Sequence, residues 1–329
     1  MDSLITLASA LMLSATSAAA QPPAPDTIAP ETITTTHTGL QGELAGTLEG
    51  DLAEGTPAVL IVPGSGPTDR DGNSPLGIAA QSYKLLAEAL AQRGIASVRI
   101  DKRGMFASAD AIPDPNAVTV ADYVADLEAW ADTIAQRTGG QCVWLLGHSE
   151  GGMISMAAAA KDPARYCGLL LVASPGVNTG DVIRAQLVAN PANAPIMPQV
   201  DAIIAKLKAG DNVPLDEMHP GLIPLFGPQV QGFVGSMLRQ EPAELIAAHD
   251  LPVLIVNGRE DLQTPAADAE ALAAARPDAT LVLLDGVNHV LKQVPPGDRA
   301  ANTASYGNPD LPLAPGIAEA IADFVLAER

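Results

Sequence analysis

Short apolar runs alternate along this chain with stretches whose apolar residues recur at helical spacing. The segment 33–50 alternates and carries glycines, which predicts an antiparallel hairpin at a sheet edge. The pattern predicts an α/β fold, with a mostly parallel twisted sheet and helices on both faces. The continuous apolar runs have the length of strands buried on both faces and lie at 58–62, 95–100, 142–146, 168–173, 252–256 and 280–284.

Two predicted helices carry start signals. Thr119, with Asp122 three residues later, predicts a capping box, and Gly139 marks the end of that helix. Thr264 followed by Pro265 predicts a capping residue and a first-turn proline. These signals lie between the predicted strands, as an α/β fold requires.

About eighty residues separate the runs at 168–173 and 252–256, more than one crossover helix needs. Apolar residues within this interval repeat at helical spacing over 200–207 and 230–238. We therefore expect a helical cap over one edge of the sheet; the alternative is a peripheral layer with no role in access. The predicted organisation is a core in two parts with the cap between them: 32–175, 176–250 and 251–329.

The amino terminus predicts export. Residues 1–20 have an apolar middle and end in three alanines, as a cleavable signal peptide does, and 21–31 form a proline-rich, extended leader. This predicts a periplasmic or secreted protein. The rest of the chain has no second apolar run of about 20 residues, so no membrane span is expected.

The composition and net charge of the chain limit the kinds of partner that the protein is expected to bind. The chain has 329 residues, of which 47% are hydrophobic and 17% charged, which is typical of a globular protein with a sizeable core. A net charge of −20 disfavours nucleic acid and anionic membranes, because both would be repelled. A small molecule is the expected partner.

The two cysteines, Cys142 and Cys167, each begin a predicted strand. Neighbouring parallel strands would place these positions roughly 5 Å apart, within disulfide reach. A disulfide and two buried free thiols both remain open.

The segment "GHSEG", residues 147–151, follows a predicted buried strand and precedes a helix-forming stretch. This strand–turn–helix context is the one that the G-x-S-x-G motif requires of a nucleophilic serine. Small residues on either side, Gly147, Gly151 and Gly152, let the chain turn sharply at Ser149. An ordinary glycine-rich turn is the alternative.

A nucleophilic serine needs a base, and the chain has five histidines. His289 follows the last predicted strand, on a loop with freedom to reach back to the serine. His37 lies in the edge hairpin, His148 is expected to point away from the serine beside it, and His219 and His249 lie in or beside the insertion.

The base needs an acid to orient it. Asp261 lies on the loop after the strand at 252–256, which gives the chain order Ser, Asp, His. Glu260 and Asp285 are its rivals.

An oxyanion needs two N–H donors. The backbone of Glu150, after the serine, predicts one, and Ser65 in "VPGSGPTDRDG" predicts the other; a plain glycine-rich surface loop is the alternative. Asp69 stands where a dinucleotide motif needs its third glycine. Neither the histidines nor the cysteines have metal-ligand spacing. We therefore expect no cofactor and no metal.

The segments "VPGSGPTDRDGN", "YKLLAEALAQRGIASVRIDKRG", "GHSEGG", "NGREDLQTP" and "VNHVLK" together resemble the α/β-hydrolase superfamily, specifically exported bacterial proteins similar to serine-aminopeptidase-type and acyl-esterase hydrolases. The resemblance covers most of residues 40–292 and implies the α/β-hydrolase fold with a Ser149, Asp261 and His289 triad. In that family the motif at 101–104 usually continues as glycine, any residue, glycine, from which residues 105–107 depart.

The roles of two further residues stay open. Arg70 could reach a substrate carboxylate or belong to a solvated cluster, and Tyr306 could border the site or pack as a surface strap.

The expected function is a serine hydrolase that cleaves a small carboxylic ester through an acyl-enzyme. A peptidase or thioesterase with the same triad is one alternative, and a non-catalytic binding protein on this fold is the other.

Overall fold

The computed structural model describes residues 29–328 apart from 39, 113, 115–116 and 189. The predicted signal peptide at 1–20 and most of the predicted leader at 21–31 lie outside the described residues.

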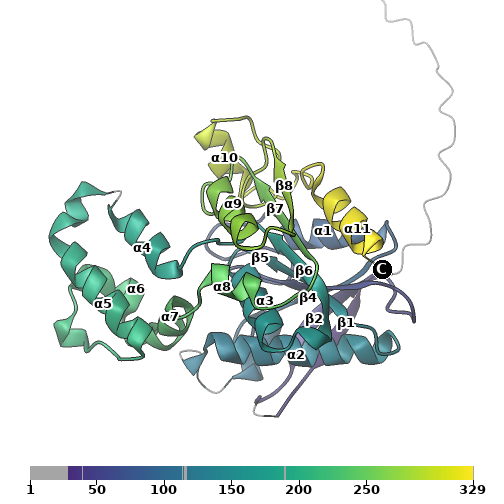
Figure 1. Ribbon diagram of the computed structural model, residues 1–329, viewed down its shortest axis with the longest axis horizontal. Coiled ribbons are helices and arrows are strands. Elements are labelled where there is room, and N and C mark those ends of the chain that lie inside the picture. Colours follow the sequence, from purple (N-terminus) through teal and green to yellow (C-terminus); the bar gives the residue numbers. More distant parts are fainter. Residues whose placement is uncertain (1–28, 39, 113, 115–116, 189, 329) are drawn as a thin grey trace, which may run out of the picture.

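The centre of the molecule is an eight-stranded sheet in the order β1-β2-β4-β3-β5-β6-β7-β8 (Figure 1). β1 and β2 form an antiparallel hairpin, β2 also pairs antiparallel with β4, and the remaining pairs are parallel. The predicted edge hairpin and parallel sheet are thereby confirmed. The strands are Glu31–Thr35, Leu44–Glu49, Ala58–Val62, Ala96–Ile100, Val143–His148, Tyr166–Val172, Val253–Gly258 and Thr280–Leu284 for β1 to β8.

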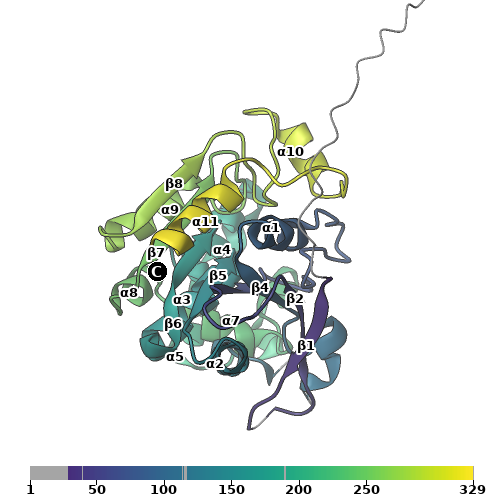
Figure 2. The ribbon, with the colours of Figure 1, turned by 90° about the vertical axis from the view of Figure 1, so that its right-hand side faces the viewer.

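Helices cover both faces of the sheet, because successive strand residues point to opposite sides. In β3, Leu60 and Val62 belong to one apolar cluster, and Val59 and Ile61 belong to the other. α1 (Ser82–Ala91) and α11 (Ile317–Ala327) pack on the second cluster's face (Figure 2). The opposite face carries α2 (Val120–Arg137), α3 (Glu150–Lys161), α8 (Pro242–Ala247) and α9 (Ala266–Ala275).

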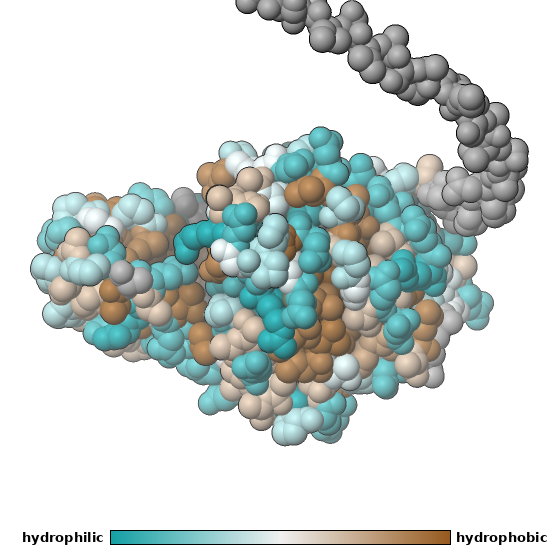
Figure 3. Space-filling model, turned by 90° about the horizontal axis from the view of Figure 1, so that it is seen from above, coloured by the Kyte–Doolittle hydropathy of each residue, from teal (hydrophilic) through white to brown (hydrophobic). Residues whose placement is uncertain are grey.

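Four helices form a lobe that projects from the body (Figures 1 and 3). They enclose a small apolar core of their own, which includes Ile203, Leu222 and Phe226. α8 packs instead on α3 and α9. Within the segment predicted as a cap, this lobe is therefore a separate packing unit while α8 belongs to the core. The lobe helices are α4 (Thr179–Val188), α5 (Met197–Ala209), α6 (Ile223–Phe226) and α7 (Gln231–Leu238).

One helix cap is confirmed and one is wrong. Thr119 and Asp122 form the expected capping box at the start of α2. At the start of α9 the N-cap residue is Pro265, not Thr264. The Thr264 hydroxyl bonds the Ala173 carbonyl at 2.9 Å and lies 2.9 Å from the Asp261 carboxylate, so it cannot serve the helix.

A disulfide joins Cys142 and Cys167, whose Cα atoms are 5.1 Å apart at the start of β5 and β6. This decides between the two alternatives that the sequence left open.

No helix among the described residues is long and apolar enough to cross a membrane.

Candidate active site

Ser149 lies on the turn between β5 and α3 with φ 54° and ψ −124°, a conformation that a side chain rarely adopts. The turn is sharp because the chain on either side packs backbone against backbone. A Cβ on Gly147 would lie 2.4 Å from the Gly151 carbonyl oxygen, and one on Gly151 would lie 2.3 Å from that of Val62. Glycine at both positions is therefore required for the serine to project from the end of the strand.

Asp261 and His289 follow neighbouring strands, β7 and β8, and meet at the same edge of the sheet. The imidazole Nδ1 of His289 lies 2.8 Å from Oδ2 of Asp261. Oδ1 accepts the backbone N–H groups of Gln263 at 2.8 Å and Thr264 at 2.9 Å. Burial alone would raise the pKa of Asp261, but His289 and these two donors outweigh it and lower that pKa. The ionised carboxylate can only accept, so Nδ1 of His289 carries a hydrogen and Nε2 is free to take a proton.

Ser149 and His289 line one cavity that opens to solvent and has about 420 Å³ of empty space, part of which is open solvent. Within the part of the chain that the structure describes, no hydrogen bond joins the Ser149 hydroxyl to the imidazole. Such contacts commonly tighten only when substrate binds. The cavity is lined by Gly64, Ser65, Thr68, Gly72, Ile78, Ser82, Tyr83, His148, Ser149, Gln263, His289 and Val290.

Two backbone N–H groups are placed to serve this cavity. Glu150 is the first residue of α3, so its N–H has no acceptor inside the helix. The N–H of Ser65 donates to no described residue, whereas that of Gly64 donates to the Tyr83 hydroxyl at 3.0 Å. The loop packs tightly on the serine, since a Cβ on Gly64 would lie 3.3 Å from the Ser149 Cβ. The arrangement is compatible with the predicted donors, Ser65 and Glu150.

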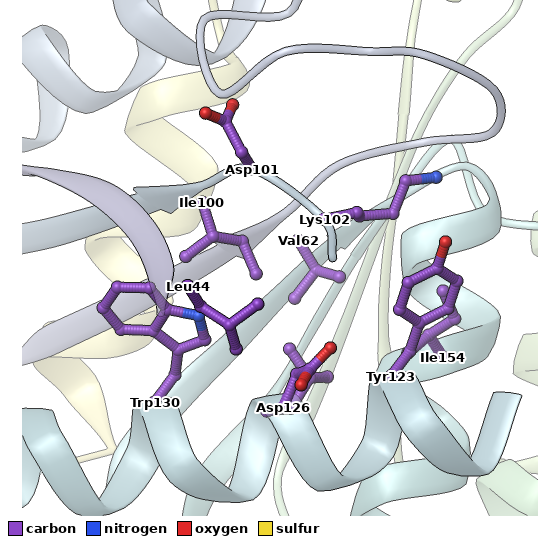
Figure 4. Close-up of a pocket in the computed structure, with 10 residues that line it drawn as sticks. Leu44, Val62, Ile100, Asp101, Lys102, Tyr123, Asp126, Trp130 and Ile154 are labelled. Atoms are coloured by element: carbon purple, nitrogen blue, oxygen red, sulfur yellow. The ribbon is translucent and has the colours of Figure 1, made fainter. Parts of the chain in front are cut away.

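The side chain of Glu150 forms a buried ion pair that sequence reasoning did not assign. Lys102, at the end of β4, donates to the Glu150 carboxylate at 3.0 Å and to the Gly64 carbonyl at 2.7 Å. Figure 4 shows Lys102 with Tyr123 from α2, whose ring centroid lies 5.5 Å from the ammonium nitrogen, at one end of a largely apolar pocket. The pair thus ties the loop after β3 to the residue beside the nucleophile.

Three residues at the site carried no sequence signal for their role: Tyr83, His148 and Thr264. Tyr83 reads as one apolar position of an amphipathic helix, and Thr264 reads as a helix cap. His148 was expected to point away from the serine, yet its ring lines the same cavity. Its nitrogens contact the Tyr83 hydroxyl at 2.9 Å and the His289 carbonyl at 2.8 Å.

Other candidates have structural contacts. Arg70 donates to the Asp101 carboxylate through its guanidinium, at 2.5 Å, and its backbone N–H, so it is held by this chain's own carboxylate. Tyr306 accepts hydrogen bonds from Gln263 at 3.1 Å and, through its carbonyl, from Ala79 at 2.8 Å. Gln263 lines the cavity whereas Tyr306 is not among its lining residues, so Tyr306 packs directly behind the cavity wall and its role stays open.

The other histidines lie apart from this cavity. His37 contacts Asp126 at 2.9 Å, His219 accepts from Gly221, and His249 is buried beside Arg276.

No group of three or more His, Cys, Asp or Glu side chains in the described ranges is placed to hold a metal ion. The absence of a cofactor stays a prediction.

Residues 76–293 match the family model described as "Serine aminopeptidase, S33", which is more than half of the chain. The chain belongs to this S33 family. The matched region of this S33 member contains the Ser149 turn and the His289–Asp261 pair.

Known relatives of this S33 chain include esterases and lipases. It is 27% identical over 242 residues to esterase EstD of Thermotoga maritima, covering 71% of this chain and 54% of that protein. It is 30% identical over 186 residues to the monoglyceride lipase of Rattus norvegicus, covering 53% of this chain and 60% of that protein. The chain thus spans little more than half the length of these curated relatives.

Solved structures confirm the fold. Est1E of Butyrivibrio proteoclasticus aligns with a TM-score of 0.54 at 17% identity, covering 90% of this chain and 98% of that one. A monoacylglycerol lipase of Paleococcus ferrophilus aligns with a TM-score of 0.53 at 17% identity, covering 88% of this chain and 100% of that one. The S33 chain has the α/β-hydrolase fold that its sequence motifs predicted.

Proposed function

We propose that this protein is a serine hydrolase that cleaves small, neutral carboxylic esters. The observation that carries the proposal is that Ser149 and His289 line one cavity while Nδ1 of His289 lies 2.8 Å from the Asp261 carboxylate, an arrangement that favours the tautomer able to act as a base. The similarity to esterases and monoglyceride lipases supports ester cleavage.

In the proposed reaction His289 Nε2 takes the Ser149 proton as the hydroxyl oxygen attacks the ester carbonyl. The N–H groups of Ser65 and Glu150 stabilise the oxyanion, each contributing roughly 3 kcal/mol to lowering the barrier. The C–O bond to the leaving group breaks, and the imidazolium gives its proton to the departing alcohol. Water then attacks the acyl-serine with His289 again as base, which releases the acid and restores the hydroxyl.

The family description raises an aminopeptidase as the second candidate. An aminopeptidase must hold the α-ammonium of its substrate, which calls for carboxylate or carbonyl acceptors. No Asp, Glu, Lys or Arg is among the described residues that line the cavity. The nearby Glu150 carboxylate is paired with Lys102, and Asp69 accepts from the backbone of its own loop. These contacts favour a neutral ester, or a thioester handled by the same groups.

A fluorophosphonate probe tests the nucleophile. We expect labelling of the wild type and none of Ser149→Ala at equal folded fraction; an unlabelled wild type would favour the binding-protein alternative. A panel of p-nitrophenyl esters of graded acyl length, acyl thioesters and aminoacyl amides then tests the substrate class. Faster turnover of the amides would replace the ester proposal with the peptidase.

We also propose that the protein is exported. The sequence of residues 1–20 supports this, and so does the disulfide, which suits an oxidising compartment. Fractionation of cells that express the full chain, with amino-terminal sequencing of the product, tests cleavage near residue 20.

A further inference from the structure

A chain of hydrogen bonds runs through residues that line the active-site cavity and joins four separate parts of the fold: the loop after β3, α1, the end of β5 and the loop after β8. The Gly64 N–H, in the loop after β3, donates to the Tyr83 hydroxyl of α1 at 3.0 Å. That hydroxyl lies 2.9 Å from Nδ1 of His148, at the end of β5, and Nε2 of His148 lies 2.8 Å from the His289 carbonyl oxygen. Tyr83 and His148 are both buried.

The direction of every proton in this chain follows from chemistry. The His289 carbonyl can only accept, so Nε2 of His148 carries the hydrogen. Burial and the neighbouring His289 lower the pKa of His148 to about 3, so its ring is neutral near pH 7 and Nδ1 has a free lone pair. The Tyr83 hydroxyl, whose pKa burial raises, therefore donates to Nδ1 and accepts from Gly64.

We propose that Tyr83 and His148 are positioning residues, which hold the backbone of the base, His289, at a fixed distance from the oxyanion loop. This inference rests on the proposed function, in which both elements act on the same substrate carbonyl. Gly64 is the residue before the predicted donor Ser65, so binding its N–H also orients the next peptide.

The first turn of α1 makes a second contact with the loop that carries His289. The Ser82 hydroxyl donates to the Val290 carbonyl at 2.6 Å. Adjacent residues of one helix therefore hold adjacent carbonyls of the loop, one directly and one through His148. The loop needs such support because it turns sharply, with the buried Leu291 at φ 60°.

The neutral state of His148 matters during the reaction. Its ring centroid lies 4.8 Å from that of His289, which becomes an imidazolium when it takes the serine proton. A second positive ring at that distance would oppose this step, whereas a neutral ring does not. The hydrogen bond accepted by Nδ1 and the one donated by Nε2 together stabilise the neutral form of the His148 ring.

Matched substitutions separate positioning from stability. His148→Gln keeps an N–H donor that reaches the His289 carbonyl, and His148→Met has a similar length but no donor. Tyr83→Phe removes the hydroxyl that links Gly64 to His148 in the chain of hydrogen bonds from Gly64 to His289, which we call the relay. Tyr166→Phe is the control, because its buried hydroxyl has no partner among the described residues. Rates are measured on p-nitrophenyl acetate and expressed per serine titrated by the fluorophosphonate, so that misfolded protein does not count.

We expect His148→Met to lower kcat roughly 10- to 100-fold, with KM within about threefold of wild type, because misplacement of a base by about 1 Å has this cost. His148→Gln should restore kcat to within about threefold, Tyr83→Phe should lose about tenfold, and Tyr166→Phe should change it by less than about twofold. Unchanged kcat per titrated serine in the Met variant, or no rescue by Gln, would overturn the proposal. Loss in His148→Gln as complete as in His289→Gln would make His148 the base instead.

A measurement without substrate keeps the two proposals apart. If the wild type is neither labelled nor active on any ester, the proposed function fails, while nitrogen NMR of the imidazole of His148 still reports on the relay. We expect a persistent Nε2–H tautomer that does not titrate between about pH 5 and about pH 9, and a changed Nδ1 signal in Tyr83→Phe. Titration of His148 within that range would contradict the relay.

Discussion

Replacing Asp261 by Asn tests the orientation of the proposed base most directly. In the wild type Oδ1 accepts two backbone N–H groups, from Gln263 and Thr264, so the amide oxygen of the Asn must take that place. The amide NH₂ then faces Nδ1 of His289, which can no longer donate. The imidazole is forced into the Nε2–H tautomer and cannot take the serine proton.

The variant should still fold. The Thr264 hydroxyl, 2.9 Å from Oδ2 of Asp261, can donate its hydrogen to the Ala173 carbonyl and accept from the new NH₂. The loss therefore falls on the reaction, and we expect kcat/KM to drop about 10³- to 10⁴-fold. This corresponds to about 4–5.5 kcal/mol of lost transition-state stabilisation.

The assay is kcat/KM on a short p-nitrophenyl ester, with folded fraction from thermal unfolding. Glu260→Gln and Asp285→Asn are the matched controls. Glu260 accepts from the Gly297 N–H at 2.9 Å, and Asp285 is an exposed partner of Arg259. Both should stay within about threefold of wild type, as surface changes usually do. Less than tenfold loss in Asp261→Asn, or an equal loss in either control, would refute the assignment.

Three further outcomes are expected. Replacing Cys142 and Cys167 together by Ser should lower the free energy of unfolding by about 3.5 kcal/mol, because the disulfide closes a loop of 25 residues; a urea midpoint unchanged from that of the oxidised wild type would contradict this. Lys292→Met should raise that free energy by up to about 2 kcal/mol at pH 7, because burial lowers the pKa of Lys292 from 10.5 to about 8, while loss of the hydrogen bond from Lys292 Nζ to the Leu311 carbonyl offsets part of the gain. Between these pH values the folded wild type binds fewer protons than the unfolded chain and gains stability as pH rises, so the advantage of the variant should vanish above pH 10.5 in urea titrations; an advantage that does not change with pH would exclude this cause. Gly147→Ala should destabilise by about 3 kcal/mol or more, because its Cβ would overlap the Gly151 carbonyl, and a melting temperature equal to that of wild type would disprove the tight turn.

The local pattern of apolar and polar residues was sufficient to predict the sheet and its helices. Strands buried on both faces need unbroken apolar runs, and each of the six predicted runs forms one of the strands β3 to β8, although β8, at the edge of the sheet, is only partly buried. The small residues around Ser149 likewise reported the sharp turn, because backbone contact at Gly147 and Gly151 excludes a side chain. The chain order of Ser149, Asp261 and His289 pointed to one end of the sheet, since parallel strands end together.

Contacts between distant loops were decided by the tertiary structure. Thr264 reads as a helix cap, yet its hydroxyl lies at the Asp261 carboxylate. The relay from Gly64 through Tyr83 and His148 joins residues up to 141 positions apart. No periodicity encodes such bonds, because each depends on where a loop ends in space.

The sequence by itself therefore determined the α/β architecture, the sharp turn at Ser149 and the candidate base and acid, because burial and steric exclusion act between residues near one another in the chain. The folded structure decided that Cys142 and Cys167 are bonded and that Tyr83 occupies the Gly64 N–H. It also showed that His148 faces the backbone of His289. Directional bonds of about 3 Å form only once packing has placed both partners.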